Sequence, residues 1–140
     1  MIRMSLNQAA ELLQCTPAQS DLTFTGITTD SRKVVPGMLF AALPGQAFDG
    51  HDYIPQAMER GAVAALVCQN VSTSLTVLHV TDVLAALGTL AGHWRSECTA
   101  KVIGITGSNG KTTVKEMVAS ILRQEGAVLA TKGNFNNELG

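Results

Sequence analysis

The chain has 140 residues, 46% of them hydrophobic, which is enough to bury a core as one ordinary domain or two small ones. Its 10 basic and 11 acidic residues are nearly balanced and form no basic run, which argues against nucleic acid or an anionic membrane as a partner. The N-terminus lacks the apolar region of a signal peptide, and the longest apolar run, 62–68, is too short to span a bilayer. We therefore expect a cytoplasmic protein with a small-molecule partner, whose 3 cysteines are reduced.

Helix and strand patterns alternate along the first part of the chain. Ser5 is a typical N-cap for a helix that continues to Gln14, with apolar residues at helical spacing. Asp52 is placed to cap a second helix over 53–60, with Pro55 in its first turn. Strands are predicted where apolar and β-branched residues cluster, at 22–27, 38–43, 62–67 and 76–80.

A long helix follows and divides the sequence. Asp82 is a good N-cap, and Val83, Leu87, Leu90 and Trp94 recur on one helical face up to about residue 97. We predict an N-terminal domain over 1–82, a linking helix over 83–98 and the start of a second domain over 99–140. Because the chain stops in a polar loop soon after this second start, we expect it to be a fragment of a longer protein.

The most specific motif lies early in the second segment. An apolar run at 102–105 predicts a buried strand, and a helical pattern over 112–124 and a strand at 127–130 follow. Between the first strand and the helix lies a polar, glycine-containing loop, made of Gly107, Ser108, Asn109, Gly110, Lys111, Thr112 and Thr113. Backbone N–H groups in such a loop, with the positive end of the helix, form a phosphate cradle. Lys111 is expected on the β- and γ-phosphates of a nucleotide and Thr112 on Mg²⁺.

The spacing of this loop departs from the standard P-loop, because Gly104 lies one residue too early. The order of strand, loop and amphipathic helix nevertheless indicates nucleotide binding. We therefore predict an α/β fold, in which a small N-terminal α/β domain precedes the first βαβ unit of a P-loop, parallel-sheet ATPase domain.

Three segments together resemble the Mur ligases, which extend a UDP-linked muramoyl peptide. Residues 30–53, from Asp-Ser-Arg to Asp-Gly-His-Asp-Tyr, are similar to the N-terminal signature of that family. Residues 104–113 are similar to its ATP loop, including the unusual glycine spacing. Residues 131–140 contain Asn-Phe-Asn-Asn, which resembles the MurF type and is the one feature that favours it over the MurE type.

The resemblance implies substrate-binding residues. It places Asp30, Ser31 and Arg32 at the uridine end of the nucleotide sugar, and the same pocket would be lined by Gln46, Ala47 and Phe48. It also places Asn134, Asn136 and Asn137 on phosphate or peptide groups of the substrate. Without the resemblance, Asp30 could form an Asx-type turn beside a solvated Arg32, Phe48 could be a core residue, and the asparagines could form a turn. The histidines show no metal-ligand spacing.

The resemblance also implies an activity. A MurF-type enzyme uses ATP and Mg²⁺ to join UDP-N-acetylmuramoyl-tripeptide to D-alanyl-D-alanine through an acyl phosphate, with Lys111 and Thr112 in catalytic roles. We expect a monomer, and we expect these 140 residues alone to be inactive, since the family's remaining domains have no counterpart here. A MurE-type ligase that adds the third residue, another P-loop enzyme and a non-catalytic nucleotide-sugar binding module remain alternatives.

Overall fold

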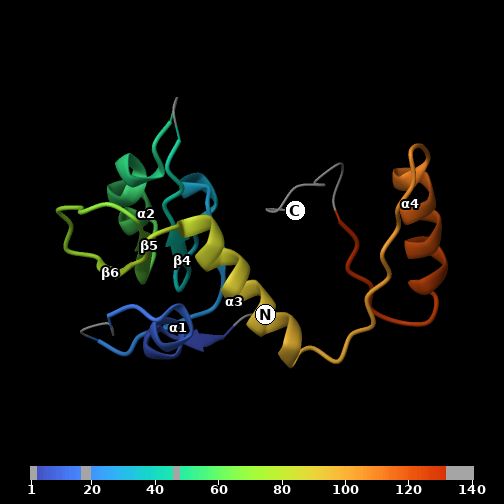
Figure 1. Cartoon of the computed structure of the whole chain (residues 1–140), viewed down its shortest axis with the longest axis horizontal. Coiled ribbons are helices and arrows are strands. Elements are labelled where there is room, and N and C mark those ends of the chain that lie inside the picture. Colours follow the sequence, from blue (N-terminus) through green and yellow to red (C-terminus); the bar gives the residue numbers. More distant parts are fainter. Residues whose placement is uncertain (1–2, 17–19, 46–47, 132–140) are drawn as a thin grey trace. The chain divides into compact units, whose positions relative to one another are not determined.

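The computed structural model describes residues 3–16, 20–45 and 48–131 (Figure 1). The chain divides into two compact units, 1–98 and 99–140. In the described residues, no helix is long and apolar enough to cross a bilayer.

A parallel sheet forms the centre of the first unit. Its strands follow chain order, β3-β4-β5-β6, and each neighbouring pair is parallel. They are β3 (Ile27–Thr28), β4 (Leu39–Ala41), β5 (Ala64–Val67) and β6 (Thr76–His79). A separate antiparallel ribbon pairs β1 (Met4–Ser5) with β2 (Thr23–Phe24). The predicted α/β class is therefore confirmed for this unit.

Helices cover both faces of this sheet. Leu39 and Leu66 belong to one core cluster, together with residues of α1 (Leu6–Leu13) and α3 (Val83–Glu97). Phe40 and Val67, their neighbours along the strands, belong to a second cluster with residues of α2 (Ile54–Glu59) (Figure 1). Since successive side chains of a strand point to opposite faces, a strand covered on both sides must be apolar throughout. This explains the unbroken apolar runs in the sequence.

Side-chain caps fix two of the helices where the sequence predicts them. The hydroxyl of Ser5 accepts from the N–H of Gln8, and the Gln8 side chain accepts from the N–H of Ser5, which completes a capping box on α1. Asp82 caps α3 by accepting from the N–H groups of Leu84 and Ala85 at 2.8 and 3.1 Å. The predicted cap at Asp52 is wrong.

The helical segment near Asp52 begins earlier than the sequence pattern suggests. Asp49 caps a short 3₁₀ helix, η2 (Gly50–Tyr53), and α2 continues directly from it with Tyr53 at its N-cap and no side-chain cap. Because η2 already presents a hydrogen-bonded turn, α2 has no need of a polar cap of its own.

The single strand predicted over 22–27 is also wrong. Its alternating residues divide into β2 and β3, which lie in different sheets. At the division the N–H of Thr25 donates to the carbonyl of Gly37, and the carbonyl of Gly26 accepts from Leu39. Alternation of polar and apolar residues marks extended backbone but does not say which sheet receives it.

The helix assigned to a linking segment over 83–98 belongs to the first unit. Val83, Ala86 and Leu90 are buried in the same core cluster as residues of α1, and the boundary between the units falls after Cys98. The division of the chain into functional domains stays a prediction.

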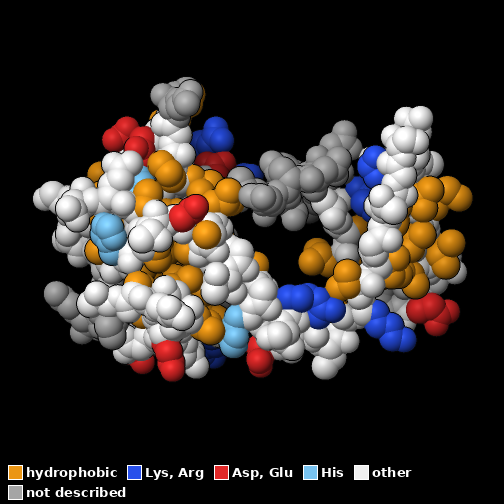
Figure 2. Space-filling view, in the orientation of Figure 1, with side chains coloured by type: hydrophobic (Ala, Val, Ile, Leu, Met, Phe, Trp, Pro, Cys, Tyr) orange, Lys and Arg blue, Asp and Glu red, His pale blue; other side chains and the backbone are white. Residues whose placement is uncertain are grey.

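In the second unit the described residues form one helix, α4 (Lys111–Leu122), and the strands predicted at 102–105 and 127–130 are not formed within 99–131. Val102 and Leu129 are 71% and 99% exposed, and Met117 and Ile121 on α4 are also exposed. Figure 2 shows hydrophobic side chains gathered along α4. A strand needs a neighbour for its backbone groups, and the described part of this unit offers none.

Candidate functional site

Polar segments follow the parallel strands at one edge of the sheet. Residues 30–33 follow β3, Asp49 and His51 lie in the segment after β4, and Cys68 and Gln69 follow β5. The carboxyl ends of parallel strands meet at the same edge, and loops held by a rigid sheet are where binding residues concentrate. This edge is therefore the candidate site of the first unit.

The segment after β3 forms a tight turn around Asp30. It continues as a 3₁₀ helix, η1 (Ser31–Lys33), for which Asp30 is the N-cap. The Asp30 carboxylate accepts from the backbone N–H of Arg32 at 3.0 Å and from its guanidinium Nε and Nη2 at 2.9 Å each. The side-chain and backbone hydrogen bonds from Arg32, helped by the nearby charge of Lys33, lower the pKa of Asp30 to about 2. The Arg32 side chain is 79% exposed, so the turn presents an oriented cation to solvent.

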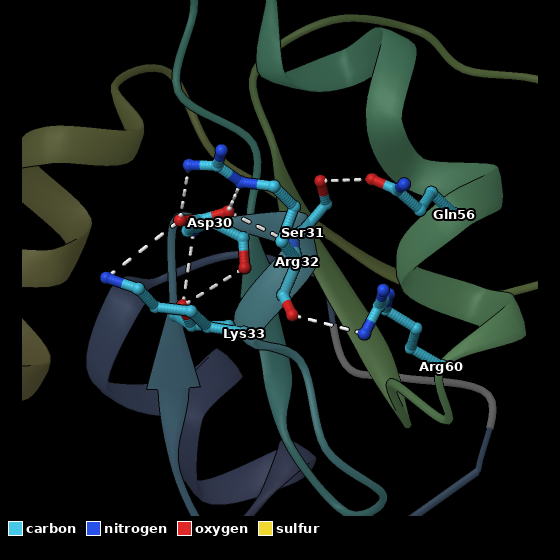
Figure 3. A network of polar contacts seen from close by, with 7 residues as sticks. Asp30, Ser31, Arg32, Lys33, Gln56 and Arg60 are labelled. Atoms are coloured by element: carbon cyan, nitrogen blue, oxygen red, sulfur yellow. Dashed lines mark hydrogen bonds and ion pairs between the residues drawn. The ribbon is translucent and has the colours of Figure 1, made fainter.

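Helix α2 holds this turn from behind. The buried Ser31 donates its hydroxyl proton to Oε1 of Gln56 at 2.5 Å (Figure 3). One helical turn further along, Nη1 of Arg60 donates to the backbone carbonyl of Arg32 at 3.1 Å. The sequence analysis did not select Gln56 or Arg60. The available signal was their i, i+4 spacing in a predicted helix.

A second polar network joins the segment after β4 to the end of β5. Nδ1 of the buried His51 lies 2.5 Å from Oδ1 of Asp49, and Nε2 accepts from the backbone N–H of Cys68 at 3.1 Å. Gln69 donates to the other oxygen of Asp49 at 3.0 Å. The backbone and side-chain hydrogen bonds from His51 lower the pKa of Asp49. Since Nε2 accepts a backbone N–H, the arrangement requires the proton of His51 on Nδ1.

This network fixes the base of the loop that the sequence analysis assigned to the uridine pocket. Within that loop Phe48 is 76% exposed, which excludes the alternative that it is a core residue. Gln46 and Ala47 lie outside the described residues, and so do Asn134, Asn136 and Asn137.

The predicted phosphate loop of the second unit, residues 107–113, leads directly into α4. Gly107 and Gly110 have φ values of 153° and 76°, which residues with a Cβ rarely adopt, and Gly110 is the N-cap of α4. The exposed residues Thr112 and Thr113 lie in the first turn of α4. Nζ of Lys111 folds back and donates to the carbonyl of Gly107 at 2.5 Å.

No group of three or more His, Cys, Asp or Glu side chains that could hold a metal ion is present in the described ranges. Mg²⁺ bound with a nucleotide needs few protein ligands, because phosphate oxygens and waters supply the others. The exposed hydroxyl-bearing Thr112, next to Lys111 at the start of α4, fits this modest requirement.

Comparison with known families accounts for both units. Residues 23–95 match the model described as Mur ligase family, catalytic domain, and residues 105–140 match the Mur ligase middle domain. The chain belongs to the Mur ligase family. The first match contains the Asp30 turn and the His51 network, and the second contains the phosphate loop.

Relatives within the Mur ligase family are similar along the whole chain. The chain is 45% identical over 140 residues to the UDP-N-acetylmuramoyl-tripeptide--D-alanyl-D-alanine ligase of Escherichia coli K12, covering 100% of this chain and 31% of that protein. It is 37% identical over 144 residues to a UDP-N-acetylmuramoyl-L-alanyl-D-glutamate--2,6-diaminopimelate ligase of Listeria monocytogenes, covering 98% and 29%. The chain therefore spans about a third of the length of these Mur ligases.

Solved Mur ligase structures agree with this assignment. A crystal structure of MurF from Acinetobacter baumannii has a TM-score of 0.87 at 35% identity, covering 99% of this chain and 32% of that one. MurF from Thermotoga maritima, in complex with ADP, has a TM-score of 0.72 at 35% identity, covering 80% and 26%.

Proposed function

We propose that the chain supplies the nucleotide-sugar site and the phosphate loop of an ATP-dependent ligase that adds D-alanyl-D-alanine to UDP-N-acetylmuramoyl-tripeptide. The observation that carries this proposal is the 45% identity to a ligase of that name over 140 residues, which include both the Asp30 turn and the phosphate loop. A glycine loop before a helix is a feature that binds the phosphates of such substrates.

The first unit would bind the uridine end of the nucleotide sugar. Asp30 orients the exposed guanidinium of Arg32, and the exposed ring of Phe48 offers an apolar surface to a base. Ser31 lies between Asp30 and Arg32 and supplies a hydroxyl. We place Gln46 and Ala47 in the same pocket because they precede Phe48.

The second unit would bind ATP. Lys111 would stabilise charge on the β- and γ-phosphates, and backbone N–H groups over 107–113 would surround them. Mg²⁺, held by Thr112 and phosphate oxygens, would neutralise part of the phosphate charge. The substrate carboxylate would take the γ-phosphoryl group as its bond to ADP breaks, and the amine of D-alanyl-D-alanine would then displace phosphate to form the amide. We place Asn134, Asn136 and Asn137 on the substrate near this step.

A MurE-type ligase, which adds the third residue, is the second candidate, favoured by the 37% identity to the Listeria monocytogenes enzyme. A non-catalytic nucleotide-sugar module would bind the UDP-sugar without ATP. For the proposed ligase we infer a monomer that acts in the cytoplasm, where both of its substrates and ATP would be available.

Calorimetric titration tests the proposal. The chain is titrated with UDP-N-acetylmuramoyl-tripeptide, with UDP-N-acetylmuramoyl-dipeptide and with Mg-ATP. The titrations are repeated on Ser31→Ala and Lys111→Ala. We expect Ser31→Ala to weaken only nucleotide-sugar binding and Lys111→Ala only ATP binding. Preference for the dipeptide would favour the MurE type, and failure of the folded chain to bind either sugar nucleotide would contradict the proposed first site.

Catalysis needs a separate measurement. We expect the 140-residue chain to release no phosphate from ATP in a D-alanyl-D-alanine-dependent manner. Such release by the chain alone would show that the catalytic machinery is complete within it.

A further inference from the structure

The hydroxyl of Ser31 has a defined polarity. It donates its one proton to Oε1 of Gln56 at 2.5 Å, and Ser31 is only 7% exposed (Figure 3). A serine hydroxyl has one proton and two lone pairs. With its proton committed to Gln56, Ser31 can act only as an acceptor toward a further group.

The fold maintains this polarity. Ile54 and Ala57 bury one side of α2 in the second core cluster and leave the exposed Gln56 on another side. Arg60, one turn after Gln56, donates to the carbonyl of Arg32, the residue after Ser31. Hydrogen bonds with Gln56 in α2 and with Arg60 at its C-cap therefore hold the turn, and the bond to Gln56 sets the direction of the hydroxyl.

We propose that Gln56 is a positioning residue that sets base specificity: by taking the Ser31 proton it makes Ser31 an acceptor for the N3–H of uracil. This inference rests on the proposed uridine site. Uracil carries a donor at N3, whereas cytosine carries a lone pair there. Against cytosine N3 the Ser31 hydroxyl would present a lone pair to a lone pair, which leaves cytosine N3 without a donor at a poorly hydrated position.

Two variants at position 56 separate the direction of the Ser31 hydroxyl from the effect of changing the side chain as such. The carboxylate of Gln56→Glu can only accept, so it preserves the direction of the Ser31 hydroxyl. The ammonium of Gln56→Lys can only donate, so Ser31 accepts from it and turns its own proton toward the ligand. Position 56 is exposed in a helix, and both Glu and Lys are good helix formers, so each variant is expected to fold.

The experiment titrates UDP and CDP into the chain and its variants at one pH, and compares the ratio of the two dissociation constants. The ratio cancels the effect of the added charge on the diphosphate, which both ligands share. We expect the wild-type chain and Gln56→Glu to prefer UDP by roughly ten- to a hundredfold, the cost of an unpaired polar group. We expect Gln56→Lys to lose this preference or to prefer CDP.

A matched control is Gln124→Lys, which makes the same change at an exposed position in the second unit and should leave the ratio unaltered. An unaltered ratio in Gln56→Lys would overturn the inference while leaving the uridine site intact, whereas a wild-type preference for CDP would overturn both. Failure of the folded wild-type chain to bind either nucleotide would overturn the uridine site and the inference together. Circular dichroism confirms that each variant is folded.

Discussion

Substitutions of His51 test whether the network after β4 stabilises the first unit. The imidazole makes two short bonds, one from Nδ1 to Asp49 and one from the N–H of Cys68 to Nε2, and Nε2 also lies 3.8 Å from Sγ of Cys68. An Asn side chain can replace the donor at Nδ1 but is too short to replace the acceptor, whereas a Gln side chain can reach the position of Nε2 and accept. His51→Asn and His51→Gln therefore remove one bond each, and His51→Ala removes both.

Of the two variants that each remove one bond, His51→Asn is expected to lose more stability. It leaves the partly buried N–H of Cys68 without an acceptor, which costs about 1–3 kcal/mol. With a urea m-value of about 1–3 kcal/mol/M for a small unit, this corresponds to a shift of about 1 M in the unfolding midpoint. His51→Gln keeps that acceptor and loses the bond to Asp49, whose carboxylate remains capped by Gln69 and partly solvated, so its shift should be smaller.

Urea unfolding followed by the fluorescence of Trp94 measures these shifts. Trp94 is the only tryptophan, and it packs against the core cluster of the first unit. His79→Asn, at an exposed position in β6, is the control and should change stability by less than about 0.5 kcal/mol. If His51→Asn unfolds at the same urea concentration as His79→Asn, the N–H of Cys68 has found water instead, and the reasoning is wrong.

Three further substitutions have expected outcomes. The folded-state pKa of Asp30, about 2, lies below its ordinary value of 3.8, so its carboxylate stabilises the folded state above about pH 4 and this contribution is lost as pH falls toward 2. Asp30→Asn should therefore lower the midpoint of urea unfolding at pH 7. It should also reduce the difference between the midpoints at pH 7 and pH 2.5, and an unchanged difference between the midpoints would contradict this. Leu78→Ala, at a fully buried position, should cost about 2–5 kcal/mol in the same unfolding assay. In Gly110→Ala the new side chain must adopt the left-handed conformation of Gly110, which costs about 1–2 kcal/mol. We expect this variant to bind Mg-ATP roughly tenfold more weakly, as measured by calorimetry.

Local patterns in the sequence were sufficient for much of the first unit. Ser5 and Asp82 cap their helices because a cap involves only residues two or three positions away. The apolar runs of β4 and β5 predict strands buried on both faces, as observed. The run at 22–27 failed because the choice between two sheets depends on hydrogen bonds to Gly37 and Leu39, more than ten residues away in the chain.

The candidate site likewise contains contacts between residues near in the sequence and contacts between residues far apart in it. The bonds from Arg32 to Asp30 span two residues, and the sequence suggested an Asx-type turn there. The bond from Ser31 to Gln56 spans 25 residues and that from Cys68 to His51 spans 17, so both depend on how helix and strand pack. The sequence could name residues of the turn, but it could not show which side chains hold it in place.

The second unit shows the difference between a helix, which forms from local contacts, and a strand, which needs a partner strand. Helix α4 and the positive φ of Gly110 are present although the predicted neighbouring strands are not formed within 99–131, since a helix satisfies its own backbone hydrogen bonds and a strand does not. Lys111 then donates to the carbonyl of Gly107, an exposed contact between a cation and a neutral acceptor. A phosphate oxygen is the stronger acceptor for an ammonium group, because the bond is charge-assisted at both ends. A bound nucleotide would therefore draw Lys111 away from Gly107 at little cost, so the arrangement seen here does not argue against the proposed role of Lys111.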